Sequence, residues 1–505
     1  MRRLAAAILI LLFTVLMSPT GVASAETGAI DTAAVDRFMS DYLARTRLPG
    51  ASVAITHGDR VVHVAGYGHD STGAAVTGDT RMPVASVSKS FAALAVMQLV
   101  EAERVELDAP VRQYLPEFRM ADSRSERITV RQLLNQTSGM SDRAFPDLRR
   151  PQANSLTGAV ERLQDARLAD DPGTEFHYHN PNFQVAARLV EVIAGQPYAD
   201  YLRERIFEPI GMNNSVTVDK PRDVPDLPRG YVRLYGIAVP VEEMDWFVGG
   251  SHGIVTTAAD LAQWLILQNG GGRAANGQRL VSADSVDLMH VRSRVGTYGM
   301  GWQHDESDSS RVFHGGDWFT YTAAQELVPE SGYGIAVIAN TGMALEDDPE
   351  LIVEGLIDLT RGLEPGVSRP AGIYADWALA AMTLVVALAA GIALARVHRW
   401  AVRQEGRPAW LVILRQLPYL TAIPYLVFLP ALAGIVFAGR AGGFQHVLYV
   451  FPAVLVFLVV ATVAGVAVVV TRLVRLSIVR LRAWRGRRTT PETDSAQPLL
   501  RATPP

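Results

Sequence analysis

The sequence of 505 residues contains no cysteine and only two lysines, Lys89 and Lys220. The lack of cysteine excludes disulfide bonds, a cysteine nucleophile and thiolate metal sites. An exported part of the chain must therefore be stable by its own core. The scarcity of lysine is also informative, because the other strongly basic residues are all arginine. A position that holds lysine in such a chain is expected to need a proton that can be released, and arginine cannot release one.

One of the two lysines follows a serine by three positions, in Ser86-Val-Ser-Lys89, at the start of the apolar run 91–100. Residues at i and i+3 share a helix face, so the amine would lie beside the hydroxyl at a helix N-terminus. The apolar run predicts a buried helix, and burial lowers the pKa of a lysine. The pattern therefore predicts Ser86 as a nucleophile and Lys89 as its base, without histidine.

Both ends of the chain carry apolar segments. Residues 1–25 have the basic start, apolar stretch and small-residue cleavage site of a signal peptide. Three uncharged apolar stretches, 377–395, 417–438 and 447–471, are each near the ~20 residues that cross a bilayer. Arginines are concentrated between the first two stretches and after the third, whereas the remaining loop has only Arg440. The positive-inside rule then predicts a cytoplasmic tail and places everything before residue 377 outside the cytoplasm.

These segments divide the chain into an exported domain at 29–363, a linker at 364–373, a membrane domain at 374–471 and a basic tail at 472–505. Strand-like runs occur at 51–56 and 60–65, with a hairpin between them, and again only at 311–314, 321–328 and 333–339. The middle is mostly helical in pattern, as at 182–195 and 261–268. We predict a mixed α/β (α+β) fold, with one antiparallel sheet flanked by helices, an all-helical lobe and a cleft between them. Three transmembrane helices follow.

Three motifs, in this order, resemble those of the serine β-lactamase and penicillin-binding-protein superfamily, in the branch of class C β-lactamases, DD-peptidases and related esterases. They are Ser86-Val-Ser-Lys89, Tyr178-His-Asn180 and His314-Gly-Gly316. The resemblance covers the exported domain and none of the membrane part. It implies a β-lactamase/transpeptidase-like fold and an acyl-enzyme formed at Ser86 with a peptide, amide or ester, cell-wall peptide being one such substrate.

The first two motifs would supply the groups that move the proton. We expect Lys89 and Tyr178 to share the proton of Ser86, with the pKa of the phenol lowered by a nearby ammonium ion. Asn180, two residues after the tyrosine, would point into the same cleft and bind a substrate amide or hold Lys89 in place.

The third motif would hold the substrate. His314 would hydrogen-bond the substrate from its strand, and Gly315 and Gly316 would leave room for a substrate backbone. By resemblance, the oxyanion would be held by the main-chain N–H groups of Ser86 and Asp317.

Two positions depart from the family pattern. His179 stands where a small serine is usual, and would narrow the cleft or act as a proton carrier. His314 replaces a lysine and would be a weaker, pH-dependent cation. These departures argue against a dedicated β-lactamase and leave DD-peptidase, D-amino-acid amidase and carboxylesterase activities open. His177 and His179 also suggest a metal pair, but with no third ligand evident we predict no metal and no cofactor.

Two other functions compete with a hydrolase. One is a ligand-binding or regulatory protein that signals through the membrane helices, which the joint presence of Ser86, Lys89 and Tyr178 disfavours. The other is a transporter, which the uncharged apolar stretches disfavour. The basic segment 472–488 would either lie on anionic lipid as an amphipathic helix or serve only to fix the topology. We predict a lipid bilayer and a small substrate as partners, and no nucleic acid.

Overall fold

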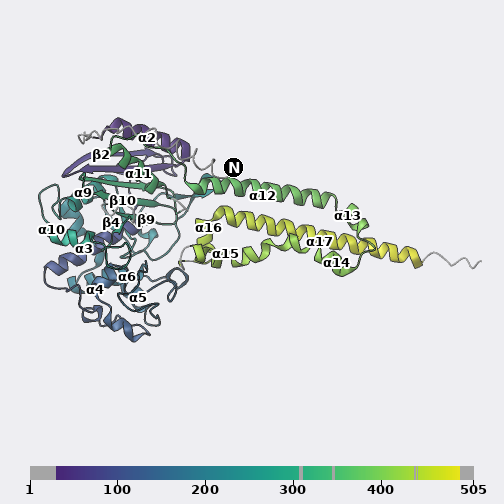
Figure 1. The fold of residues 1–505 in the computed structure, drawn as a ribbon, viewed down its shortest axis with the longest axis horizontal. Helices are drawn as coiled ribbons and strands as arrows, with labels where there is room; N and C mark the ends of the chain where they lie inside the picture. Colours follow the sequence, from purple (N-terminus) through teal and green to yellow (C-terminus); the bar gives the residue numbers. More distant parts are fainter. Residues whose placement is uncertain (1–29, 306–310, 344–346, 437–439, 441, 489–505) are drawn as a thin grey trace, which may run out of the picture.

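A computed structural model describes residues 30–305, 311–343, 347–436, 440 and 442–488. The predicted signal peptide, 1–25, and the end of the tail, 489–505, lie outside the described residues. Figure 1 shows two parts: a globular part that contains the sheet, and an elongated bundle of the C-terminal helices that extends from one side of it.

A six-stranded antiparallel sheet joins the two ends of the globular part. Its order is β2-β1-β11-β10-β9-β8, and β1 pairs with β11 from Ala51↔Ala339 to His57↔Tyr333. The first and last strands along the chain therefore lie side by side, and the prediction of one sheet built from both ends is confirmed. The strands are β1 (Gly50–His57), β2 (Arg60–Gly68), β8 (Gln303–His304), β9 (Val312–Asp317), β10 (Thr322–Val328) and β11 (Tyr333–Ala339).

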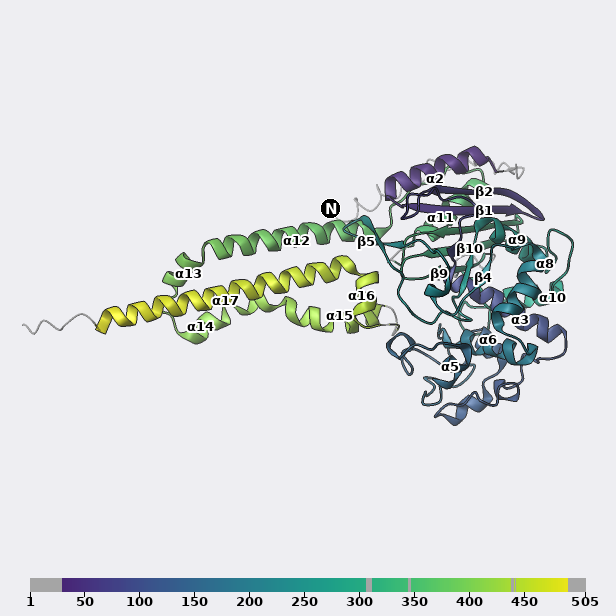
Figure 2. The ribbon, with the colours of Figure 1, turned by 180° about the vertical axis from the view of Figure 1, so that it is seen from behind.

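Helices cover both faces of this sheet, which explains why β10 and β11 are buried along their whole lengths. One face packs against α2 (Thr32–Thr46) and α11 (Asp348–Thr360), and Figure 2 shows α2 running along β2 and β1. The other face packs against α3 (Ser88–Glu101) and α9 (Ala258–Asn269). The helix predicted at 261–268 lies within α9, which begins after Thr257, whose side chain accepts from the backbone N–H of Asp260.

The middle of the chain forms the predicted helical lobe beside the sheet. Its longest helix, α6 (Pro181–Ala194), begins with proline at its first position and ends at Gly195, whose φ of 74° suits glycine. The other helices of the middle segment are α4 (Val130–Leu134), α5 (Leu156–Glu161), α7 (Tyr198–Leu202), α8 (Glu208–Ile210) and α10 (Ala283–His290). Small sheets contain β3 (Met82–Pro83), β4 (Val216–Thr217) and β7 (Ile254–Thr256), and the hairpin β5 (Gly230–Leu234) and β6 (Ile237–Val241).

The C-terminal region contains three helical stretches that are long and apolar enough to cross a membrane, at Ala371–Ala395, Leu417–Ile435 and Pro452–Arg485. Its helices are α12 (Ala371–Ala395), α13 (Val397–Arg403), α14 (Ala409–Leu414), α15 (Ala422–Val436), α16 (Phe444–Val450) and α17 (Pro452–Arg488). The number of stretches agrees with the prediction.

The helix ends in this region do not coincide with the predicted segment boundaries. The expected third stretch, 447–471, begins inside α16, and the long helix α17 starts only at Pro452. Proline lacks the N–H needed to continue a helix and disfavours helical geometry in the residue before it. The basic segment from 472 continues α17 rather than forming a separate helix, and the expected linker 364–373 ends where α12 begins, at Ala371. Residues 437–438 of the expected second stretch lie outside the described residues.

Candidate active site

The predicted nucleophile and base meet at the start of α3. Ser86 lies in a 3-10 turn, η1 (Ala85–Val87), and Lys89 lies in the first turn of the helix. The Lys89 Nζ atom is 2.8 Å from the Ser86 Oγ atom, and it donates to the main-chain carbonyl of Ser251 at 3.1 Å. Ala85 has a φ of 46°, which costs energy in a residue with a Cβ and is typical of turns that position functional groups.

The amine of Lys89 is fully enclosed, with 0% of its surface exposed. Burial first, and the positive charge of Arg440 second, hold the pKa of Lys89 well below the ordinary lysine value, while Asp317 opposes them. A deprotonated amine has a lone pair that can accept the proton of Ser86, while its N–H group still donates to Ser251. The predicted direction of the Lys89 pKa is therefore confirmed.

Tyr178 lies on the other side of Ser86, in the segment before α6. Its side chain hydrogen-bonds Ser86, and the Lys89 Nζ atom lies 4.9 Å from the centroid of its ring. The predicted lowering of its pKa is wrong, because burial raises the pKa of Tyr178 to about 12 despite the opposing effects of Arg440 and Ser86. Lys89 is itself shifted toward the neutral form, so it supplies little of the expected ammonium charge. Tyr178 is thus a neutral phenol at physiological pH.

The two residues after Tyr178 point in different directions. Asn180 lines the same pocket as Ser86, and its Oδ1 atom is buried without a hydrogen-bond partner among the described residues. His179 is fully buried and does not line this pocket; its Nδ1 atom is 3.5 Å from Asp142 Oδ2. The expectation that His179 narrows the cleft or carries protons there is wrong, because adjacent side chains of an extended segment alternate in direction. His177 hydrogen-bonds Asp170 at 2.6 Å and also lies outside the pocket lining.

His314 lies on β9 with its ring facing Tyr298. Its Nε2 atom is 2.9 Å from the Tyr298 hydroxyl, and its Nδ1 atom is 2.5 Å from the carbonyl oxygen of Gly315. Because a carbonyl only accepts, Nδ1 must donate and Nε2 must accept. Burial, followed by Lys89, lowers the pKa of His314 to about 3. The expectation of a pH-dependent cation is therefore corrected to a neutral ring, and both of its nitrogens already have partners within the protein.

The glycines of β9 allow the strand to approach the serine turn. A Cβ atom on Gly316 would lie 2.2 Å from the Val84 carbonyl oxygen and 3.0 Å from the Ser86 nitrogen. No side chain fits against backbone atoms at that distance. A Cβ on Gly315 would lie 2.9 Å from a carboxylate oxygen of Glu350. The third motif thus keeps β9 in direct contact with the Ser86 backbone.

The structure gathers the predicted residues around one pocket of about 170 Å³. Its lining includes Ser86, Tyr178, Asn180, His314, Gly315 and Asp317. Lys89 lies behind Ser86, and Gly316 lies beneath the serine turn. Asp317 hydrogen-bonds Asp347, and burial raises the pKa of Asp317 although the bond to Asp347 and the charges of Arg440 and Lys89 oppose the shift.

Sequence reasoning missed several residues of the pocket. His252 and Glu350 both line it. Burial holds the pKa of His252 well below its usual value. Burial, together with the nearby Asp317, raises the pKa of Glu350 to about 7. Arg440 also lines the pocket, and in the sequence it stands out only as the single arginine of its loop. None of these belongs to a local pattern, because their neighbours in the site are distant in the sequence.

Comparison with known proteins agrees with this architecture. A family model described as "Beta-lactamase" matches residues 35–356. "Penicillin-binding protein 4" of Amycolatopsis lactamdurans is 31% identical over 342 residues, which are 64% of this chain and 89% of that protein. "Protein flp" of Staphylococcus aureus is 26% identical over 313 residues, which are 61% of this chain and 62% of that protein.

Solved structures show the same fold. An octameric penicillin-binding protein homologue from Pyrococcus abyssi has a TM-score of 0.55 and 24% identity, covering 69% of this chain and 81% of its own. A D-stereospecific amidohydrolase from Streptomyces sp. has a TM-score of 0.52 and 22% identity, covering 64% of this chain and 98% of its own. The chain therefore belongs to the β-lactamase family of serine hydrolases, and three apolar helical stretches follow the family domain.

Proposed function

We propose that this protein is a membrane-anchored serine hydrolase that forms an acyl-enzyme at Ser86 with a peptide, amide or ester. The observation that carries the proposal is the 2.8 Å contact between Ser86 Oγ and the enclosed Lys89 Nζ, with the Tyr178 phenol hydrogen-bonded to the same serine. A nucleophile within reach of a base that burial keeps neutral is the requirement for acyl transfer near neutral pH.

The reaction would proceed in two steps, acylation of Ser86 and hydrolysis of the acyl-enzyme. Ser86 Oγ attacks the carbonyl carbon and passes its proton to Lys89, and the main-chain N–H groups of Ser86 and Asp317 would stabilise the oxyanion. The bond from the carbonyl carbon to nitrogen or oxygen then breaks, and the leaving group takes a proton from Lys89, relayed through the hydroxyl of Tyr178. Water hydrolyses the acyl-enzyme by the same groups in reverse, which restores Ser86.

The placement of the protein is part of the proposal. A signal peptide at 1–25 and three transmembrane helices would leave the hydrolase domain, about 29–363, on the outer side of the membrane. This is supported by the arginines that lie between the first two apolar stretches and after the third. The relatives named penicillin-binding protein and amidohydrolase support DD-peptidase or amidase substrates, cell-wall peptide among them; an esterase is equally compatible with the chemistry.

The test is covalent labelling of the full-length protein in lipid nanodiscs, with an uncharged fluorophosphonate and with a fluorescent penicillin, read by intact mass. We expect the wild type to gain a fluorophosphonate adduct and Ser86→Ala to gain none. Ser90→Ala is the matched control, because this serine is also buried at the start of α3 but does not line the pocket. A wild type without adduct under conditions where it remains folded would contradict the proposal and favour a ligand-binding protein.

A further inference from the structure

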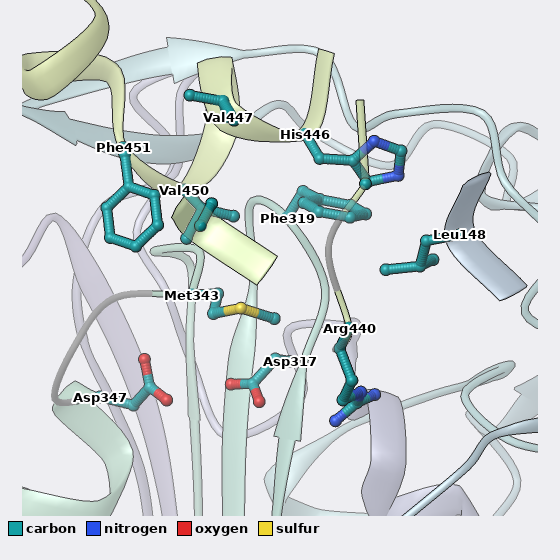
Figure 3. A pocket seen from close by; sticks show the side chains of 12 residues that line it. Leu148, Asp317, Phe319, Met343, Asp347, Arg440, His446, Val447, Val450 and Phe451 are labelled. Atoms are coloured by element: carbon teal, nitrogen blue, oxygen red, sulfur yellow. The ribbon is translucent and has the colours of Figure 1, made fainter. Parts of the chain in front are cut away.

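The C-terminal region contributes a side chain to the candidate active site. Arg440 lies between α15 and α16, and its Cζ atom stands 4.8 Å from the centroid of the Tyr178 ring. It lines the pocket that contains Ser86, and also a second, more apolar cavity of about 200 Å³ next to it. In Figure 3, Val447 and Val450 of α16 and the following Phe451 gather at one end of this cavity, and Arg440, Asp317 and Asp347 lie at the other.

The C-terminal region is fixed to the globular part by contacts around this cavity. The Tyr449 hydroxyl donates to the main-chain carbonyl of Glu242 at 2.8 Å. The ring of Phe319, just after β9, lies 5.3 Å from the His446 ring and 5.6 Å from the Tyr449 ring, measured between centroids. These contacts hold the segment that follows Arg440 against the edge of the site, so its placement there has a structural basis.

Arg440 differs in charge from the other basic groups around the serine. The pKa values of Lys89 and His252 are held well below their ordinary values, and that of His314 falls to about 3. Each of these groups is therefore shifted toward its neutral form. Arginine stays protonated in proteins. Among the described residues that line the Ser86 pocket, Arg440 is the only arginine or lysine.

Among the described residues, the guanidinium of Arg440 has one ion-pair partner, the carboxylate of Asp142. Its Nε atom is 3.7 Å from Asp142 Oδ2, beyond a normal hydrogen bond, and that carboxylate also faces His179. Within the described part of the chain, no hydrogen bond engages the Arg440 side chain, which is 35% exposed. A cation stacked on an aromatic ring keeps the N–H groups at its edge available, and a planar guanidinium can hold a carboxylate through two parallel hydrogen bonds.

We propose that Arg440 binds a carboxylate of the substrate, so that the C-terminal region completes the specificity site of the hydrolase. This inference rests on the proposed function and adds the substrate class: an amide or ester with an acidic group close to the scissile bond. Of the pocket-lining residues that the structure describes in the globular part, none is a lysine or an arginine, and β9 presents a neutral His314.

The experiment compares full-length variants in nanodiscs of zwitterionic lipid, using acyl thioesters with a free carboxylate and the same thioesters with that group methylated. One pair of thioesters carries the carboxylate on the acyl group and a second pair carries it on the leaving group. The comparison of the two pairs shows on which side of the scissile bond the carboxylate is bound. We expect the wild type to favour one carboxylate substrate by about 10- to 100-fold in kcat/KM, the range of a charge-assisted hydrogen bond. Arg440→Ala should lose this preference mainly through KM, and Arg440→Lys should retain part of it.

The matched control is Arg150→Ala. Arg150 is also stacked on an aromatic ring, 5.1 Å from the centroid of Phe145, but it is exposed and does not line the pocket. It should keep the wild-type preference. The inference would be overturned if Arg440→Ala kept the wild-type preference. It would also be overturned if Arg440→Ala turned over both the carboxylate substrate and its methylated form faster than the wild type, because Arg440 would then obstruct the site. Normal fluorophosphonate labelling with no preference in the wild type overturns this inference alone, whereas absent labelling overturns the proposed function as well.

Discussion

Large apolar side chains are buried in the globular part and exposed in the C-terminal region. In the globular part, Trp264 and Leu265 on α9 are completely enclosed. In the C-terminal helices, Val385 is 64% exposed and Ile435 is 77% exposed. Apolar surface of that extent is unfavourable in water, and a lipid environment removes the cost. The C-terminal helices, with their exposed apolar surface, thus suit a lipid environment and the globular part suits water, and the candidate site lies where the two parts meet.

The two regions also differ in the charge of the side chains that they contribute to the candidate site. The globular part supplies Lys89 in an environment that favours the neutral amine, whereas the C-terminal region supplies Arg440, which stays charged. A base must be able to lose its proton, and an anion-binding group must keep its own. The two regions therefore provide two kinds of basic side chain, a neutral base for the proposed reaction and a permanent cation for the proposed substrate carboxylate.

The largest effect is expected where the neutral amine is removed. Lys89→Met keeps the length of the side chain but leaves no lone pair for the Ser86 proton, so fluorophosphonate labelling should slow by about 10²- to 10⁴-fold. Thermal melting should stay the same or rise, because a buried amine is replaced by an apolar group. Arginine is a poor replacement here, since it would bury a permanent charge.

Labelling of Lys89→Met at the wild-type rate would remove lysine from the role of base. It would also contradict the assignment of the base to the globular part and of the anion-binding group to the C-terminal region. The rate is read by stopped labelling and intact mass, and the melting temperature by circular dichroism.

The next effect concerns the contact between β9 and the serine turn. In Gly316→Ala, the new Cβ would meet the Val84 carbonyl at 2.2 Å, and β9 would have to move away from Ser86. A displacement of that kind in a catalytic centre costs about 10²-fold in rate. Gly366→Ala is the control, because nothing lies within 4 Å of its added Cβ. Equal labelling rates in the two variants would show that the oxyanion groups do not depend on this contact.

A smaller effect is expected in the pH dependence. Because the folded-state pKa of Lys89 is lowered, the amine is neutral above that pKa and gains a proton as the pH falls through it, so labelling should decline on the acid side. Arg440 is one of the causes of the lowering. In Arg440→Ala the pKa of Lys89 should therefore rise, and the acid limb of the labelling profile should move to higher pH.

The profile is measured with the uncharged fluorophosphonate, so that substrate charge does not contribute. An acid limb at the same pH in both proteins would mean that the two regions are electrostatically independent. His314 should contribute no step near pH 6.5, since its pKa lies at about 3.

The smallest effect concerns the junction itself. Tyr449→Phe removes the hydrogen bond to the Glu242 carbonyl and should lower stability by about 0.5–1.5 kcal/mol. Proteolysis at the junction, followed over time in nanodiscs, should be modestly faster, with labelling at Ser86 unchanged. A large loss of labelling would show that the site depends on the docking of the C-terminal region more strongly than one hydrogen bond suggests.

Much of the fold could be predicted from local patterns. The hairpin of β1 and β2 follows from two β-rich runs separated by His57-Gly-Asp59, and the start of α9 from the capping threonine Thr257. The helix boundaries near Pro452 were predicted less well, because hydropathy alone does not weigh the break that a proline makes in an apolar run.

Contacts between residues that lie close along the chain could be predicted from their spacing, whereas the effect of burial on their pKa values depends on the tertiary structure. Ser86 and Lys89 are joined by the period of a helix, so their contact could be read directly. The raised pKa of Tyr178 and the neutral ring of His314 depend on how completely distant segments enclose them. The approach of Arg440 to Tyr178 depends on the docking of the C-terminal region, and no local pattern encodes a contact between segments so far apart in the sequence.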